Sequence, residues 1–236
     1  MKQLRIKTFN IGWWFYIILT IICLILLSTL KNRITNIDHK YNLVLIISVI
    51  EYIILRIYKF SLKDIRPDYN YYNELPCYLC NQSTIMCILA CLTRNTGIMA
   101  YCVSVGTIGA LLAIFLPDRY NIDQLFFSKQ AFGFYGYHCL LIISCLSFYF
   151  LGLYNPKPSD AIYSVAYTII LVIIAHITNL ILVTTKLNPI SNYAFTMYPD
   201  NSILDKLYKI LPVKLFYLVP ISLIFGLMSY ILFSIL

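Results

Sequence analysis

The stretch from Glu74 to Asn95 reads "ELPCYLCNQSTIMCILACLTRN" and places four cysteines in an apolar segment that opens with a proline: Cys77, Cys80, Cys87 and Cys91. Cysteines in such a pattern serve as a redox pair, as metal ligands, as a nucleophile or as small packing residues. Pro76 fits the first turn of a helix, so we expect the helix to start near Leu75. Cys80 would then lie about one turn in, on one face with Thr84, Cys87 and Cys91.

Cys80 and His138 are the pair whose types could support nucleophilic catalysis. A thiol near a helix N-terminus lies at the positive end of the helix dipole, which favours a thiolate. His138, in "FYGYHCLL", lies a few residues into another apolar run, where an ionisable side chain is costly and is a functional candidate. A cysteine beside a histidine is a minimal activated nucleophile. The alternative, that Cys80 packs and His138 is a neutral histidine bonded to a neighbouring helix, stays open.

Redox and metal chemistry fit these residues less well. Cys77 and Cys80 have the spacing of a dithiol motif, but we expect them on the cytoplasmic side, which is normally reducing. Zinc needs about four ligands, and a second cysteine or histidine pair at matching spacing is missing. We therefore predict no metal and no cofactor. Outside this stretch, four cysteines are interpreted as apolar fillers: Cys23, Cys102, Cys139 and Cys145.

The composition predicts the elements that must position these residues. The chain has 236 residues, is 60% hydrophobic and only 12% charged, with a mean hydropathy of +0.77. This is typical of an integral membrane protein rather than a soluble one. Six uncharged runs of about 20 residues, and a seventh apolar run that is interrupted by Glu51, Arg56 and Lys59, predict an all-α, polytopic transmembrane bundle of about seven spans in one domain, 1–236. The predicted spans are 11–30, 42–60, 75–93, 97–117, 132–154, 161–185 and 214–236.

The distribution of lysine and arginine predicts the orientation of the bundle. With the N-terminus inside, 12 basic residues lie inside: Lys2, Arg5, Lys7, Lys59, Lys63, Arg66, Arg119, Lys129, Lys186, Lys206, Lys209 and Lys214. Five lie outside: Lys31, Arg33, Lys40, Arg94 and Lys157. We expect a multi-pass protein of the cell membrane with a retained first span. The net charge of +8 then reflects topology and attraction to anionic lipids, and predicts no nucleic-acid partner.

Two further features have polar residues in places that suggest function. Glu51 lies near the middle of the second predicted span, where a carboxyl group must be protonated, paired or facing a polar cavity. The last predicted cytoplasmic loop contains Asn192, Tyr193 and Asp205, which we interpret as a lid or headgroup-binding loop. An ordinary connector is the alternative reading of this loop. His176, late in the sixth span, is interpreted as a packing or supporting histidine.

Several segments resemble the YwaF-type family of integral membrane proteins over roughly residues 70–236. "LPCYLC" resembles that family's "LPLHLC" segment, and "GTIGALLAIFLPD" (106–118) its segment ending in Pro-Asp. "FGFYGYHCLLIISCLSFYF" (132–150) resembles its phenylalanine-rich helix start with a histidine. "NYAFTMYPDNSILD" (192–205) resembles its loop ending in an aspartate. The order of these four segments also matches.

The resemblance implies an activity, because that family is distantly similar to animal multi-spanning phospholipid acyltransferases. Carried over, it implies Cys80 as nucleophile and His138 as base. The chain departs from the family pattern at several polar positions. Tyr78 replaces a histidine, Asn81 replaces an acidic residue, and Gly109 replaces a glutamine. These departures imply either an altered substrate or a lineage that has kept the fold without the activity.

The leading hypothesis is a membrane-bound lipid acyltransferase or acyl hydrolase that uses Cys80 and His138. Asn81 or a backbone N–H would stabilise the oxyanion, and Asn192, Tyr193 and Asp205 would bind the substrate. Its partners would be membrane lipids and an acyl donor. The alternative is a non-enzymatic protein, either a small transporter that uses Glu51 or a structural bundle. A thiol redox protein is a third reading and requires the reverse topology.

Overall fold

The structure is a computed structural model that describes residues 5–64, 69–117, 121, 123–199 and 202–236. Five named parts of the sequence predictions lie outside the described residues: Lys2, Arg66, Asp118, Arg119 and residues 200–201.

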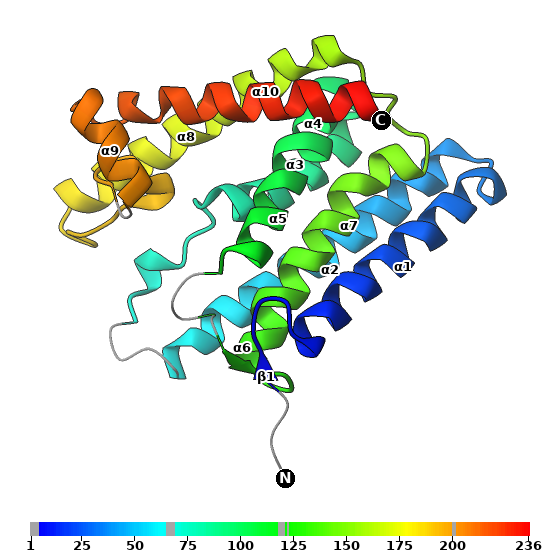
Figure 1. The fold of residues 1–236 in the computed structure, drawn as a ribbon, viewed down its shortest axis with the longest axis horizontal. Helices are drawn as coiled ribbons and strands as arrows, with labels where there is room; N and C mark the ends of the chain where they lie inside the picture. The colour runs from blue at the N-terminus through cyan, green and yellow to red at the C-terminus, as the bar shows by residue number, and fades with distance from the viewer. Residues whose placement is uncertain (1–4, 65–68, 118–120, 122, 200–201) are drawn as a thin grey trace.

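Helices account for nearly all of the regular structure (Figure 1). The longer ones are α1 (Ile11–Arg33), α2 (Ile37–Ser61), α3 (Leu79–Thr93), α8 (Ala161–Thr184), α9 (Ser202–Ile210) and α10 (Val219–Ile235). Two further helical runs each contain a π-helix: α4 (Thr96–Tyr101), η3 (Cys102–Gly106) and α5 (Thr107–Phe115), then α6 (Lys129–Ala131), η4 (Phe132–Gly136) and α7 (Tyr137–Phe150). Short 3-10 turns are η1 (Leu62–Asp64), η2 (Tyr71–Asn73), η5 (Pro158–Asp160), η6 (Tyr193–Phe195) and η7 (Phe216–Leu218). Two short strands, β1 (Arg5–Ile6) and β2 (Gln124–Leu125), pair antiparallel with Arg5 opposite Leu125.

The two runs that contain π-helices form the centre of the bundle. Thr96–Phe115 and Lys129–Phe150 are mostly buried, whereas α1, α8 and α10 expose most of their surface. α7 packs against α1, α2, α3 and α5, and α8 packs against α4 and α10. In Figure 1, α8 and α10 lie together across one end of the other helices. Gly106 permits close packing here, because an added Cβ would lie 2.7 Å from Cys145 Sγ.

The apolar surface of the outer helices fits a lipid environment. Their exposed side chains are largely isoleucine and leucine, and within the described residues five helices are long and apolar enough to cross a membrane. α2 is long enough, but it contains Glu51, Arg56 and Lys59. α3 has 15 residues, about 22 Å of helix, against a hydrocarbon core of about 30 Å. The predicted helical bundle is confirmed, and the count of seven spans stays a prediction.

Long-range contacts group the predicted loops into two ends of the bundle. At one end Arg94 pairs with Asp38 at 2.5 Å, and Lys40 Nζ donates to Leu151 O at 2.9 Å. At the other end Arg5 pairs with Asp123 at 2.6 Å. Lys40 and Arg94, both predicted on the outside, thus lie at one end of the bundle. Arg5, predicted on the inside, lies at the other end. Which end faces the cytoplasm stays a prediction.

Candidate functional site

Cys80 lies in the first turn of α3. The helix begins at Leu79, with Tyr78 at the N-cap position and Pro76 in the preceding turn. The predicted start near Leu75 was therefore wrong, because the segment that contains Pro76 folds as a turn against other elements. Backbone N–H groups of a first helical turn have no partner within the helix. Cys80 is thus closer to these donors than the sequence suggested.

The four cysteines of the 74–95 stretch have different surroundings. Cys80 is partly buried, and its Sγ lies 4.0 Å from the point where a Cβ on Gly109 would stand. Cys87 Sγ lies 3.5 Å from Cys145 Sγ in the core, and Cys91 is also buried. The Cys77 thiol contacts the Thr178 hydroxyl at 3.9 Å.

The environments of Cys77 and Cys80 argue against a dithiol pair. Cys77 packs in a small cluster with Tyr72, Leu75 and Tyr193, while Cys80 packs against the main core. All eight cysteines are free thiols. The spacing of a redox motif is present in the sequence, but the helix start at Leu79 falls between the two residues and directs them to different neighbours.

His138 is the second residue of α7, directly after the π-helix η4. It is buried, and its Nδ1 lies 2.8 Å from the Phe134 carbonyl oxygen. The rings of Phe134 and Tyr137 lie 4.7 and 4.8 Å from the imidazole centroid. π-helices widen the helix locally and are frequent at functional sites. An Nδ1–H bonded to a carbonyl leaves Nε2 as the basic nitrogen.

A buried chain of hydroxyl groups connects the α3 turn that holds Cys80 to the α7 turn that holds His138. The Tyr137 hydroxyl lies 3.0 Å from Thr84 Oγ1, and Thr84 Oγ1 donates to Glu51 Oε1 at 2.5 Å. Thr84 Oγ1 also lies 3.4 Å from the Cys80 carbonyl. Since a hydroxyl has one proton, the shortest contacts define a chain from Tyr137 through Thr84 to Glu51.

The same cluster contains further buried polar side chains. Glu51, Thr84 and Ser144 are fully buried, and Ser144 lies beside the Glu51 carboxyl group. Asn81 Oδ1 lies 3.5 Å from the Tyr137 hydroxyl, while its Nδ2 has no hydrogen-bond partner among the described residues. An orphaned buried donor is costly, so a group of this kind is either strained or reserved for a ligand.

Charged groups from α2 lie beside the start of α3. Lys59 Nζ pairs with Glu74 Oε2 at 2.7 Å and lies 5.5 Å from the centroid of the Tyr78 ring. Arg56 donates to the Glu74 carbonyl oxygen at 2.8 Å. These contacts hold the segment before α3 against the end of α2 and place a cation next to the N-cap residue.

Tyr193 of the last loop is built into the segment before α3. Its hydroxyl donates to Tyr72 O at 2.5 Å and accepts from Leu75 N at 2.9 Å. Its ring lies 4.9 Å from that of Tyr78. Burial raises the pKa of Tyr193, so the hydroxyl stays protonated at neutral pH. The structure thus brings this loop residue next to Tyr78, the N-cap residue of the helix that carries Cys80.

Asn192 and Asp205 have other surroundings. The Asn192 amide donates to Tyr198 O at 2.9 Å, and its Oδ1 accepts from the Met197 and Tyr198 backbones. Asp205 is exposed on α9. His176 Nδ1 lies 3.0 Å from Thr196 Oγ1, so this histidine contacts the same loop.

Sequence reasoning missed Thr84 and Tyr137 as site residues. The available signal was general, because every hydroxyl group in an apolar span needs a hydrogen-bond partner, and it does not single out these two residues. Glu51 lacked a named partner in the sequence, and Tyr137 was passed over in favour of the adjacent His138. The partners come from three different helices, so only the packing of α2, α3 and α7 identifies them.

The apolar helices and the buried polar cluster define a multi-pass helical membrane protein. A family model described as the TMEM164 family matches residues 7–233. The chain therefore belongs to the TMEM164 family of membrane proteins. Comparison with curated proteins found no match, and comparison with solved structures found none either.

Proposed function

We propose that this TMEM164-family protein is a lipid acyltransferase or acyl hydrolase of the cell membrane, with Cys80 as nucleophile and His138 as general base. The contact between Thr84 and Tyr137 carries the proposal. Thr84 lies one turn after Cys80, and Tyr137 directly precedes His138, so this contact ties the two turns together. The resemblance of the chain to the YwaF-type family, and through it to phospholipid acyltransferases, supports the same pair.

The first step is attack on an acyl ester. Because Cys80 packs against apolar side chains, a base must take its proton, and His138 is the candidate. The sulfur bonds to the carbonyl carbon, the ester C–O bond breaks, and His138 returns the proton to the leaving oxygen. In the second step an acceptor hydroxyl, or water in a hydrolase, loses its proton to His138 and attacks the thioester. The acyl group moves to that oxygen, and the Cys80 sulfur recovers the proton.

Asn81 and the first turn of α3 are suited to stabilise the oxyanion of this reaction. Asn81 Nδ2 is a buried donor without a partner among the described residues, and it follows Cys80 directly. The backbone N–H groups of the same turn add further donors. Donors that are fixed before the reaction cost no reorganisation when charge develops on the carbonyl oxygen.

Glu51 acts in this proposal as a positioning residue. It accepts from Thr84, which in turn contacts the Cys80 carbonyl and the Tyr137 hydroxyl. Loss of Glu51 would free Thr84 to bond its own helix, and the tie between α2 and the reacting turns would weaken. Glu51 is fully buried and lies in a hydrogen-bonded cluster, which supports this role over that of an ion ligand on a water-filled path.

The substrate would enter beside the segment before α3, to which the Tyr193 hydroxyl is hydrogen-bonded. Tyr193 and Asn192 shape this loop through their hydrogen bonds, so their contribution to binding would be the position of the loop. Asp205 is exposed and remains the candidate among the three for a direct contact with a headgroup. Membrane lipids would supply both the acyl donor and the acceptor.

Covalent labelling with an acyl probe tests the proposal. The wild type, Cys80→Ala and the control Cys77→Ala are compared in the same membranes, with protein level measured in each. We expect the wild type and Cys77→Ala to be labelled and Cys80→Ala to lose the label. Equal labelling of the wild type and Cys80→Ala would end the mechanism and favour the non-enzymatic transporter or structural bundle.

A further inference from the structure

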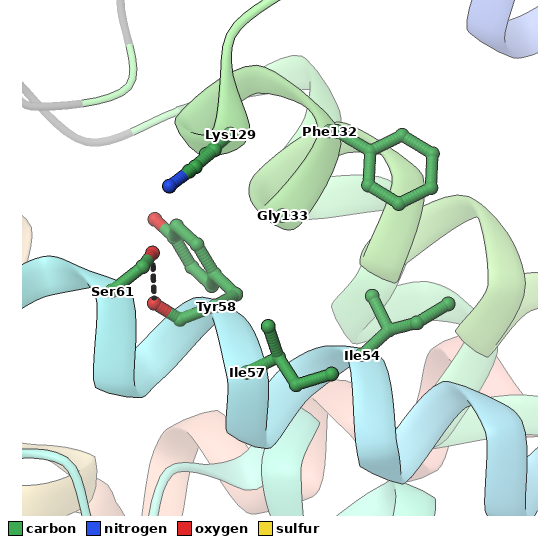
Figure 2. A pocket seen from close by; sticks show the side chains of 7 residues that line it. All are labelled: Ile54, Ile57, Tyr58, Ser61, Lys129, Phe132 and Gly133. Carbon is green, nitrogen blue, oxygen red and sulfur yellow. Dashed lines mark hydrogen bonds between the residues drawn. The ribbon is translucent and has the colours of Figure 1, made fainter.

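The bundle has a groove on its outer surface that is separate from the Cys80 cluster. It lies between the end of α2 and the helical run of α6 and η4, and has a volume of about 180 Å³. Figure 2 shows Ile54 and Ile57 along one side and Phe132 on the other. Gly133 and Tyr58 form the closely packed part, because a Cβ on Gly133 would lie 2.1 Å from the Tyr58 ring.

The walls of the groove continue into the lipid-facing surface. Ile57 is 64% exposed and Phe132 56% exposed, and both belong to helices of a membrane protein. An apolar cavity of about 150 Å³ stays free of water and accepts a molecule as large as benzene. The groove is therefore large enough for a short segment of hydrocarbon chain. In a bilayer, acyl chains are the apolar material available to fill it.

The groove lining is almost wholly apolar, and a charged side chain stands at one end of it. Lys129 is the only charged residue among the described lining, which contains no carboxylate. Figure 2 shows its amino group directed toward the Tyr58 and Ser61 side chains. A lysine whose stem lies along apolar surface and whose amino group reaches the interface attracts anionic lipid headgroups. The cation at one end and the apolar walls beyond it match a phosphate joined to an acyl chain.

We propose that this groove binds an anionic phospholipid, with one acyl chain between Ile57 and Phe132 and the phosphate at Lys129. The site does not depend on the reaction proposed for Cys80. It lies on the helical run that continues into His138, so a lipid bound there would contact the element that carries the base.

Photocrosslinking in lipid nanodiscs tests the site. The full chain is reconstituted with a trace of phospholipid that carries a diazirine in one acyl chain, with either a glycerol (anionic) or a choline (zwitterionic) headgroup. Crosslinked peptides are located by mass spectrometry. We expect the anionic probe to label the peptides of residues 54–61 and 129–133, about fivefold more than the zwitterionic one, which is the size expected for one lysine near an anionic headgroup.

Matched variants separate the chain site from the headgroup site. Ile57→Trp fills the groove and should reduce crosslinking at least fivefold, while Ile53→Trp, also exposed on α2, should change it less than twofold. Phe132→Ala removes the opposite wall and should also reduce it. Lys129→Gln should abolish the preference for the anionic probe, whereas Lys209→Gln should retain it.

Three results would overturn the proposal. Equal crosslinking of Ile57→Trp and Ile53→Trp would show that the chain does not lie in the groove. An unchanged headgroup preference in Lys129→Gln would remove the phosphate site. Crosslinks between two copies of the protein through these peptides would identify a second copy as the occupant.

Discussion

Replacing Glu51 separates its contribution to the fold from its contribution to the arrangement of Cys80. Glu51→Gln keeps an oxygen that accepts from Thr84 and has nearly the same shape. Glu51→Met keeps the volume but removes the acceptor of the 2.5 Å hydrogen bond. Removing a buried carboxyl group also removes its cost of burial, and apolar replacements of buried charged groups are often neutral or stabilising. We therefore expect Glu51→Met to melt at the wild-type temperature or above.

The rate at which Cys80 is labelled should fall in Glu51→Met, even though the melting temperature does not. A lost hydrogen bond to a buried partner is worth about 1–3 kcal/mol, but Thr84 Oγ1 has a second acceptor, the Cys80 carbonyl at 3.4 Å. We therefore expect misalignment of the Cys80 turn to raise the barrier for labelling by about 1.4 kcal/mol, near the lower end of that range, which is about tenfold in rate. The predicted order of Cys80 labelling rates is wild type, then Glu51→Gln close behind, then Glu51→Met about tenfold slower.

The assay measures two quantities on the same reconstituted samples. Thermal unfolding gives the stability, and quantitative mass spectrometry of the Cys80 peptide gives the rate of acyl-probe labelling. Labelling of Glu51→Met at the wild-type rate would refute the positioning role. A fall in both the melting temperature and the rate, with Glu51→Gln as poor as Glu51→Met, would show that an oxygen accepting from Thr84 is not what Glu51 contributes.

Three other predictions concern the frame around the site. Gly133→Ala should destabilise the protein by about 1–3 kcal/mol, because the added Cβ would overlap the Tyr58 ring. Gly136→Ala is the control and should melt close to the wild type, since the nearest atom to its added Cβ lies 3.5 Å away. Equal melting temperatures of the two variants would contradict this packing. Tyr193→Phe should cost about 1–2 kcal/mol through the lost bonds to the segment before α3 and should increase protease cleavage there; unchanged cleavage would disprove that support. The hydrogen bond from Arg5 lowers the pKa of Asp123, so their contact should be complete above pH 4 and be lost only as the pH falls through the lowered value. Arg5→Gln should shift the Asp123 titration, followed by NMR, to higher pH, and an unshifted titration would exclude the pairing.

The helical elements were predictable because their signal is local. Apolar runs located the long helices other than α9, although the run that forms α2 is interrupted by charged residues, and the span predicted at 161–185 agrees closely with α8 at Ala161–Thr184. The start of α3 was not predictable from the same signal. Pro76 suits a first helical turn, but Tyr193 takes the Leu75 N–H from a position more than 100 residues away. Long-range hydrogen bonds of this kind leave no trace in local periodicity.

The sequence singled out the ionisable residues of the candidate site, but it did not identify the hydrogen bonds that connect their helices. Glu51 and His138 stand out because ionisable side chains are rare in apolar segments, and Cys80 stands out because it lies near a predicted helix start. Thr84 and Tyr137 do not, since hydroxyl residues are common in membrane helices. The π-helices before Thr107 and Tyr137 could not be derived from α-helical periodicity either. A π-helix changes the register of the residues that follow it, so the faces of α5 and α7 were not predictable from the sequence pattern.

If Cys80 is the nucleophile, it carries the acyl group between the two steps of the proposed reaction. The most direct measurement is the mass of the Cys80 peptide after the purified protein is incubated with a phospholipid of defined acyl chains and quenched in acid. We expect an added mass equal to one acyl chain, removed by hydroxylamine as a thioester should be, and absent in a His138→Ala sample at the same time point. An unmodified Cys80 peptide, while lipid turnover proceeds at the wild-type rate, would show that Cys80 is not the nucleophile.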